Sequence, residues 1–171
     1  VITSILNLQS TYVKDKNTLM MLKESQDRIK SMAFIHESLY QTKDFSHVNF
    51  TEYVVNLSKN LMRSYDLSGR KVQFESQVEN VHLNLDQSIP CGLIINELVS
   101  NALKYAFRKK KKGIITLKIR EKDGIVSIIL ADDGDGMPKD FNYKKTDSLG
   151  LQLVVTLAEQ LNGTIKLDRR N

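Results

Sequence analysis

Apolar positions recur with a helical period through the first fifty residues of the chain. From Leu19 an apolar stripe returns every three or four residues with charged side chains between, and no glycine or proline occurs from Val1 to Phe50. The stripe consists of Leu19, Leu22, Ile29, Met32, Ala33, His36 and Leu39. The pattern predicts two long helices. The polar stretch 12–18, with Asp15, Asn17 or Thr18 as possible caps, is expected to join them into an antiparallel hairpin.

Such a hairpin has little core of its own. It is therefore expected either to dimerise into a four-helix bundle or to pack against the rest of the chain.

The period changes after a third predicted helix, which runs from Phe50 to about Tyr65 and ends near Gly69. Alternation with period two predicts strands at 72–75, 81–85, 114–120 and 125–130. The last two are joined by an Asp-Gly turn at 121–124, which is typical of a hairpin. A final helix, about 149–161, is expected to lead into 164–167. Helices combined with an antiparallel-rich sheet predict an α+β unit.

A long helix over 92–108 carries two different faces. At 100° per residue, its apolar side chains fall on one side, and these are Ile95, Leu98, Val99, Ala102 and Ala106. The opposite sector holds Glu97, Asn101, Lys104 and Arg108. An ordinary surface helix would be amphipathic too, but one acid, one amide and several bases form a set suited to holding a metal and phosphates.

Composition limits the class of protein. The 171 residues are 41% hydrophobic, enough for one or two domains with a core, and the single cysteine, Cys91, excludes an internal disulfide framework. No apolar run reaches membrane-spanning length, and the first residues do not resemble a signal peptide, so a cytoplasmic location is expected.

The net charge of +5 comes from one segment. Residues 104–122 contain nine Lys/Arg and one Glu, a local +8, which leaves −3 for the remainder. The patch has no interleaved aromatic residues and no nucleic-acid-binding motif, so no nucleic-acid partner is expected.

The stretch ADDGDGMP, residues 131–138, places three carboxylates around two glycines. A calcium loop fits poorly, because alignment on Gly136 puts Ala131 at the first ligand position and Asn142 at the last. An ordinary Asp-Gly turn and a rigid turn that contacts a nucleotide both remain open on this stretch alone.

Three segments in order resemble one family. ELVSNALKYA at 97–106 resembles the N-box of the Bergerat-fold ATPases, which include gyrase, MutL and the sensor histidine kinases. ADDGDGMP is similar to their Asp-x-Gly-x-Gly box, and SLGLQLV at 148–154 to their later glycine box. More narrowly, RIKSMAFIHESLY at 28–40 and IPCGLIINE at 89–97 resemble two-component sensor kinases related to the HWE class.

This resemblance implies a fold and two domains. Residues 1–45 would form a dimerisation and phosphotransfer hairpin. Residues 46–171 would form an ATP-binding catalytic domain of the Bergerat type, an α/β sandwich whose mixed, mostly antiparallel sheet has helices on one face.

The resemblance also implies ATP and Mg²⁺ as cofactors and gives roles to single residues. Asp132 would accept the adenine amino group, and Gly134 and Gly136 would let the backbone approach the nucleotide. Asn101 would hold Mg²⁺, with Glu97 as a second, indirect contact. Asp133 and Asp135 are expected to be bystanders.

Further roles follow for the rest of the boxes. Lys104 would reach a phosphate, Tyr105 would flank the base, and Glu97 would activate water or the acceptor histidine. The later glycine box would contribute Ser148, Leu149 and Gly150, with Ser148 in place of a common glycine. Residues 138–147 would form a short ATP lid, mobile without nucleotide, in which Lys144 and Lys145 could meet phosphate.

The family's phosphoacceptor motif is expected just upstream of Val1, and none of His36, His47 and His82 is expected to replace it. The chain is also expected to stop before the family's closing strand, as a fragment of a longer sensor kinase.

The leading hypothesis is the kinase core of a sensor histidine kinase. It would pass the ATP γ-phosphate to a histidine and then to a response regulator receiver domain. It would form a homodimer through the hairpin and meet a membrane only through missing upstream segments. The alternatives are another Bergerat-fold ATPase and a non-catalytic interaction module that keeps the fold.

Overall fold

The computed structural model describes residues 1–40, 50–65, 69, 71–79, 81–138, 140–146 and 148–169, without the side chains of 34–36, 38–40 and 64. The predicted boundary between residues 45 and 46 lies outside this range, as do His47 and the side chain of His36.

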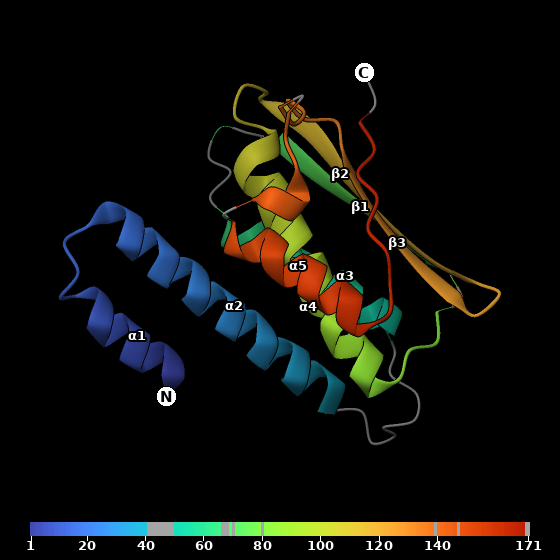
Figure 1. The fold of residues 1–171 in the computed structure, drawn as a ribbon, viewed down its shortest axis with the longest axis horizontal. Helices are drawn as coiled ribbons and strands as arrows, with labels where there is room; N and C mark the ends of the chain where they lie inside the picture. The colour runs from blue at the N-terminus through green and yellow to red at the C-terminus, as the bar shows by residue number, and fades with distance from the viewer. Residues whose placement is uncertain are drawn as a thin grey trace.

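The chain begins with a helical hairpin, as predicted. Helix α1 spans Ile2–Ser10 and helix α2 spans Lys16–Tyr40, and α1 runs back beside the first part of α2 (Figure 1). Of the three candidate caps, Asp15 caps α2, since its Oδ2 accepts hydrogen bonds from the Thr18 backbone N–H and hydroxyl, both at 2.7 Å.

A three-stranded sheet and three helices form the second unit. Strands β1 (Lys71–Glu79), β2 (Lys112–Lys122) and β3 (Ile125–Asp132) are ordered β1-β2-β3. Helices α3 (Phe50–Ser64), α4 (Leu85–Asn101) and α5 (Leu149–Gln160) lie on one face of the sheet (Figure 1). A π-helical turn, η1 (Ala102–Ala106), continues α4, and a 3-10 turn, η2 (Tyr143–Lys145), precedes α5.

The sheet is mixed, as expected, but antiparallel pairing does not predominate among the described strands. β1 pairs with β2 in parallel, from Lys71 opposite Lys112, and β2 pairs with β3 antiparallel, from Ile115 opposite Asp132. The segment 164–167 forms no strand.

The strand predicted at 81–85 is wrong. Residues 81–84 have no regular structure, and α4 begins at Leu85. Asn84 and Gln87 form a reciprocal capping box: the Asn84 side chain accepts from the Gln87 backbone N–H at 2.9 Å, and Gln87 Oε1 accepts from that of Asn84 at 3.2 Å. The alternation arose because Leu83 is buried beside the entry to the helix. The spacing of Asn84 and Gln87 was the sequence signal that could have revealed the cap.

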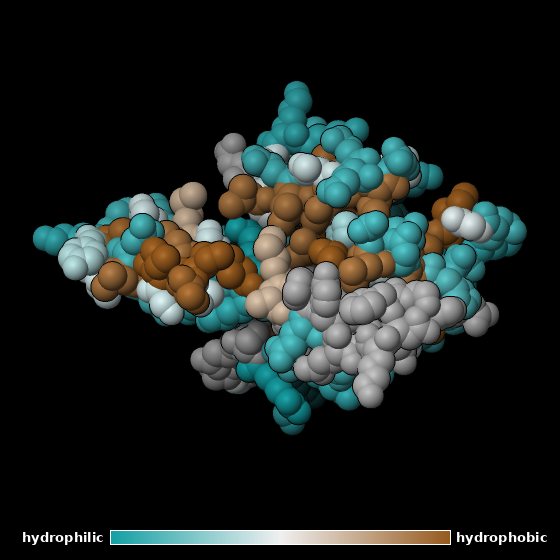
Figure 2. All heavy atoms as spheres, turned by 90° about the horizontal axis from the view of Figure 1, so that it is seen from below, coloured by the Kyte–Doolittle hydropathy of each residue, from teal (hydrophilic) through white to brown (hydrophobic). Residues whose placement is uncertain are grey.

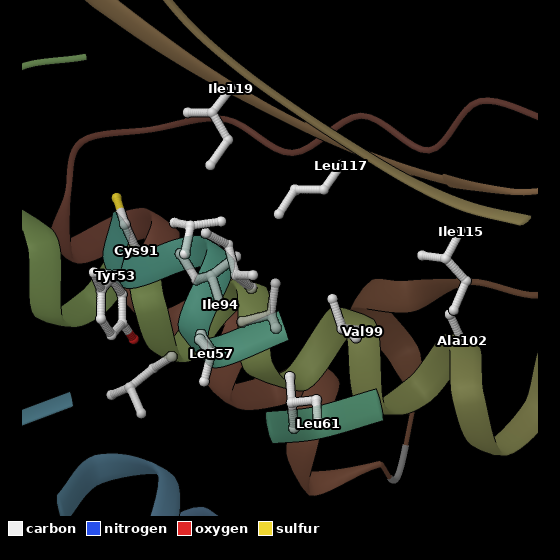
Figure 3. Packing of buried hydrophobic residues seen from close by; sticks show 14 of the residues in the cluster. Tyr53, Leu57, Leu61, Cys91, Ile94, Val99, Ala102, Ile115, Leu117 and Ile119 are labelled. Atoms are coloured by element: carbon white, nitrogen blue, oxygen red, sulfur yellow. The ribbon is translucent and has the colours of Figure 1, made fainter. Parts of the chain in front are cut away.

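The core lies between the sheet and its helices. Side chains of α3, α4 and β2 meet there, with Leu57, Val99 and Leu117 all at most 2% exposed (Figure 3). Tyr53 of α3 packs directly on Gly92 of α4, where any added Cβ would collide with the phenol ring. This contact sets how closely α3 approaches α4.

Cys91 gives a measure of this core's integrity. Burial raises the pKa of its thiol to about 11 from an ordinary 9.0. The unfolded thiol ionises at lower pH than the folded one, so the free energy of unfolding is expected to fall as pH rises from about 9 toward 11. In urea titrations over this pH range, the free energy of unfolding should fall more steeply with pH for the native sequence than for Cys91→Ala. Equal pH dependence of the two proteins would contradict the burial of this thiol.

In the described part of the chain, no helix combines the length and the apolar character needed to cross a membrane.

Candidate nucleotide-binding site

Helix α4 and its π turn carry the residues of the predicted N-box. Glu97 is buried at 4% exposure, Asn101 and Lys104 are partly buried, and Tyr105 is exposed. The predicted functional face of this helix is therefore partly covered. Its cover is α2 from the hairpin, which packs against α4, and α5 lies against α4 as well.

Glu97 is held by a residue from the hairpin. Its Oε1 lies 2.8 Å from Nε of Arg28, and both side chains are largely excluded from solvent. Gly150, at the start of α5, lies against the other oxygen, and a Cβ there would collide with Glu97 Oε2. Any side chain at 150 would therefore have to push this carboxylate aside, and Glu97 forms an ion pair with Arg28.

Lys104 is also paired with the hairpin. Its Nζ donates to Oε1 of Glu24 at 2.9 Å. Partial burial alone would lower the pKa of the Lys104 ammonium, but the hydrogen bond to Glu24 and the nearby Tyr65 and Tyr105 outweigh it, so the pKa lies above its ordinary value. The ammonium stays charged near neutral pH, as a phosphate-binding group must.

Asn101 has an unsatisfied side chain. Its Nδ2 is buried and has no hydrogen-bond partner. Such orphaned groups are rare in proteins and often mark a site that awaits an ion or ligand. The amide oxygen is a ligand that Mg²⁺ accepts. Among the described residues no group of three or more His, Cys, Asp or Glu could hold a metal, so Mg²⁺ here would depend on Asn101 together with nucleotide phosphates and water.

The acidic turn after β3 is fitted against the end of η1. Asp132 ends β3 and is exposed, and its Oδ1 accepts from the Gly134 backbone N–H at 3.0 Å. Gly134 packs on the Ala106 carbonyl, where a Cβ would collide, and Gly136 has φ +75°, in the left-handed region that favours glycine. The two glycines therefore serve the turn in different ways.

Asp133 and Asp135, which are expected to be bystanders in nucleotide binding, hold the acidic turn in place through backbone contacts. Asp133 Oδ1 accepts from the Ile114 backbone N–H at 2.7 Å, tying the turn to β2. Asp135 Oδ2 accepts from the Lys109 backbone N–H at 2.8 Å, and its own N–H donates to the Ala106 carbonyl at 2.6 Å. These bonds link segments 19 to 29 positions apart, so no local pattern in the sequence could have revealed them.

The helix does not continue to residue 108. Its last turn is the π turn η1, and Phe107 leaves helical geometry. The α-helical rotation of 100° per residue therefore no longer applies beyond Asn101. As a result, Arg108 does not lie on the same helical face as Glu97. Its guanidinium instead lies over the Tyr105 ring, 4.9 Å from the centroid. Single π turns inside helices are frequent at functional sites.

Of the predicted lid, residues 138–147, the structure describes residues 138 and 140–146. The Tyr143 hydroxyl donates to the Ile165 carbonyl at 3.0 Å, and Lys144 and Lys145 are exposed. Ser148 is the N-cap residue of α5 but makes no side-chain capping bond, and Leu149 is exposed. Ser148 is exposed, and its hydroxyl is not used to cap the helix.

The structure thus joins the three boxes at two points. Gly150 of the later box touches Glu97 of the first, and Gly134 of the acidic turn touches the last residue of η1. His82 does not belong to this group, since its Nδ1 lies 3.4 Å from Oε2 of Glu121 on β2.

Comparisons with known proteins agree with this arrangement. The sequence profile described as histidine kinase-, DNA gyrase B- and HSP90-like ATPase matches residues 86–171, and the one described as histidine kinase matches residues 1–65. The chain belongs to this ATPase family. Within it, the chain is similar to the kinase core of sensor histidine kinases.

Two relatives are sensor histidine kinases of the name PdtaS. The one from Mycolicibacterium smegmatis is 30% identical over 167 residues, and the one from Mycobacterium tuberculosis is 29% identical over 166. Each match covers 96% of this chain but 33% of the relative, so the chain spans about a third of these proteins.

A solved structure shares the fold. The histidine kinase domain of the blue-light-activated kinase EL346 from Erythrobacter litoralis has a TM-score of 0.68 and 20% identity. The match covers 94% of this chain and 84% of that domain.

Proposed function

We propose that this kinase core binds Mg-ATP and transfers the γ-phosphate to a histidine, from which a response regulator receiver domain takes it. The observation that carries the proposal is the Asn101 side chain, whose buried Nδ2 is a donor with no partner, as a phosphate oxygen would supply, and whose amide oxygen is a ligand type that Mg²⁺ accepts; it lies on the same helix as Glu97 and one turn before the charged Lys104. An amide ligand for Mg²⁺ beside a fixed cation is the equipment that phosphoryl transfer requires, because that reaction depends on positioning and charge neutralisation.

The residues take the following roles in this proposal. Asn101 holds Mg²⁺ against the phosphates, and Lys104 binds a phosphate oxygen. When bound, Mg²⁺ neutralises part of the phosphate charge. Glu97, fixed by Arg28, acts as the base that orients or deprotonates the acceptor, with at most an indirect contact to the metal.

The base of the nucleotide is assigned to the acidic turn. Asp132 accepts a hydrogen bond from the adenine amino group, and Tyr105 flanks the ring. Gly134 and Gly136 keep the turn close to η1 so that its backbone borders the nucleotide. Ser148, Leu149 and Gly150 border the phosphates at the start of α5, where unpaired backbone N–H groups favour anions.

The hairpin is assigned to dimerisation. Apolar side chains gather on the outside of the hairpin in the face shown in Figure 2. Among the residues of the hairpin, the exposed large apolar ones include Ile2, Ile5, Leu8, Tyr12, Met20, Met21 and Met32. A second hairpin could cover them in a four-helix bundle.

We place the domain boundary between residues 45 and 46, which keeps α3 in the catalytic domain. Support comes from the core, because Phe50, Val54 and Leu57 of α3 are at most 2% exposed and belong to the same cluster as α4 and β2. That none of His36, His47 and His82 accepts the phosphate stays a prediction, as does a cytoplasmic location.

Calorimetry with Mg-ATP tests the proposal on residues 1–171. A saturable one-to-one titration is expected with Mg-ATP, and much weaker binding with ATP in excess EDTA, because Asn101 acts through the metal. The absence of any heat with Mg-ATP, checked by competition with a fluorescent ATP analogue, would point to a non-catalytic module that has kept the fold.

A further inference from the structure

Four side chains of alternating charge form a row between helix α2 of the hairpin and helix α4 with its π turn η1. Lys104 Nζ lies 2.9 Å from Glu24, Glu24 lies 3.8 Å from Arg28 Nη2, and Arg28 Nε lies 2.8 Å from Glu97. Two members come from α2 and two from α4 and η1. The row is neutral overall, so each charge on α2 satisfies an opposite charge on the proposed site.

The two ends of the row differ in solvent exposure. The side chains of Arg28 and Glu97 are 13% and 6% exposed, whereas those of Glu24 and Lys104 are 24% and 26% exposed. The inner end is reinforced by a hydrogen bond from the Ser31 hydroxyl to Oδ1 of Asn96 at 2.8 Å. The inner contacts are therefore the anchor of α2, and the outer ion pair is the one that a solute can reach.

We propose that Glu24 is an affinity-determining residue of the nucleotide site: its carboxylate occupies Lys104 in place of a nucleotide phosphate, so ATP must displace it to bind. This inference rests on the proposed phosphate-binding role of Lys104. It adds a residue of the hairpin to a site otherwise made by the catalytic domain.

The competition follows from charge. A phosphate oxygen and the Glu24 carboxylate are both anions, and placing both against one ammonium brings like charges together in a partly desolvated place. Lys104 can satisfy one of them fully. Because coupling between two binding events is reciprocal, a movement that draws Glu24 away from Lys104 strengthens ATP binding by the same factor by which ATP weakens that contact.

The test is Mg-ATP calorimetry on Glu24→Gln beside Asp27→Asn. Both variants remove one negative charge from α2, but Asp27 is exposed and, among the residues that the structure describes, forms its ion pair within its own helix, with Lys30 at 3.7 Å. Glu24→Gln is expected to bind Mg-ATP about two- to fivefold more tightly, the range for releasing a partly exposed ion pair. Asp27→Asn is expected to match the native chain.

The Lys104→Met background identifies the cause. There, adding Glu24→Gln should leave ATP affinity unchanged, since no ammonium is left to compete for. Adenosine, which lacks phosphates, should bind native and Glu24→Gln proteins equally in displacement of a fluorescent nucleotide.

The results that would contradict these proposals can be told apart. A native chain that binds no Mg-ATP would overturn the proposed function. A native chain that binds Mg-ATP, with Glu24→Gln no tighter or with the same gain in the Lys104→Met background, would overturn the role of Glu24 and leave the proposed function standing.

Discussion

Replacing Asn101 by alanine is expected to abolish Mg²⁺-dependent ATP binding while leaving the protein folded. The amide is the proposed protein ligand to the metal, and no neighbouring group of acids in the described chain could replace it. Because Nδ2 makes no hydrogen bond, its removal breaks no such bond, and the free energy of unfolding should change little. Calorimetry with and without EDTA measures the first effect, and urea denaturation measures the second.

Asn101→Asp is the matched control. It keeps an oxygen at the same place, so it should retain part of the Mg²⁺-dependent binding that Asn101→Ala loses. Native Mg-ATP affinity in the alanine variant would show that the metal, and with it the phosphates, lies elsewhere.

Replacing Asp132 by alanine is expected to weaken ATP about ten- to a hundredfold, as the loss of one desolvated hydrogen bond of roughly 1–3 kcal/mol requires. Guanine carries a carbonyl where adenine carries the amino group, so the carboxylate should also reject GTP. Asp132→Ala should therefore bring the ATP and GTP affinities closer together, which competition against a fluorescent nucleotide can measure.

Asp135→Ala separates adenine recognition from support of the turn. Its carboxylate accepts a hydrogen bond from the Lys109 backbone N–H at 2.8 Å, so the free energy of unfolding should fall by about 1 kcal/mol, while ATP affinity is expected to change much less. Equal loss of ATP affinity from both substitutions would mean that the acids act together as a cluster, and the metal-loop interpretation of this turn would return.

Local patterns predicted most of the elements. The hairpin, α3, β1, β2, β3 and α5 all lie where periodicity placed them, because apolar side chains recur along each with the period of a helix or a strand. The segment 81–85 misled for the same reason, since a buried Leu83 before a helix cap looks like an alternating strand. The π turn was not predictable from periodicity, because its five residues are compatible with an ordinary helix.

Contiguous motifs identified the family and most of the proposed site. Glu97 and Asn101 were recognisable because helical spacing places them together whatever the rest of the chain does, and Lys104 was recognisable because it falls in the same contiguous box. The glycines at 134 and 150 were recognisable too, but the sequence did not reveal which contacts a side chain at these positions would disturb. A collision with the Ala106 carbonyl or with Glu97 depends on how the turn and α5 pack against α4.

By itself, then, the sequence determined the elements, the boxes and their order, all of which depend on neighbours along the chain. Only the tertiary structure decided the electrostatic partners of the site. Arg28 reaches Glu97 across 69 positions and Glu24 reaches Lys104 across 80, and charged residues on a helix usually face solvent. Which of the many charges of α2 find a partner depends on the angle and register at which α2 docks on α4, and these are set by packing between surfaces that no local pattern describes.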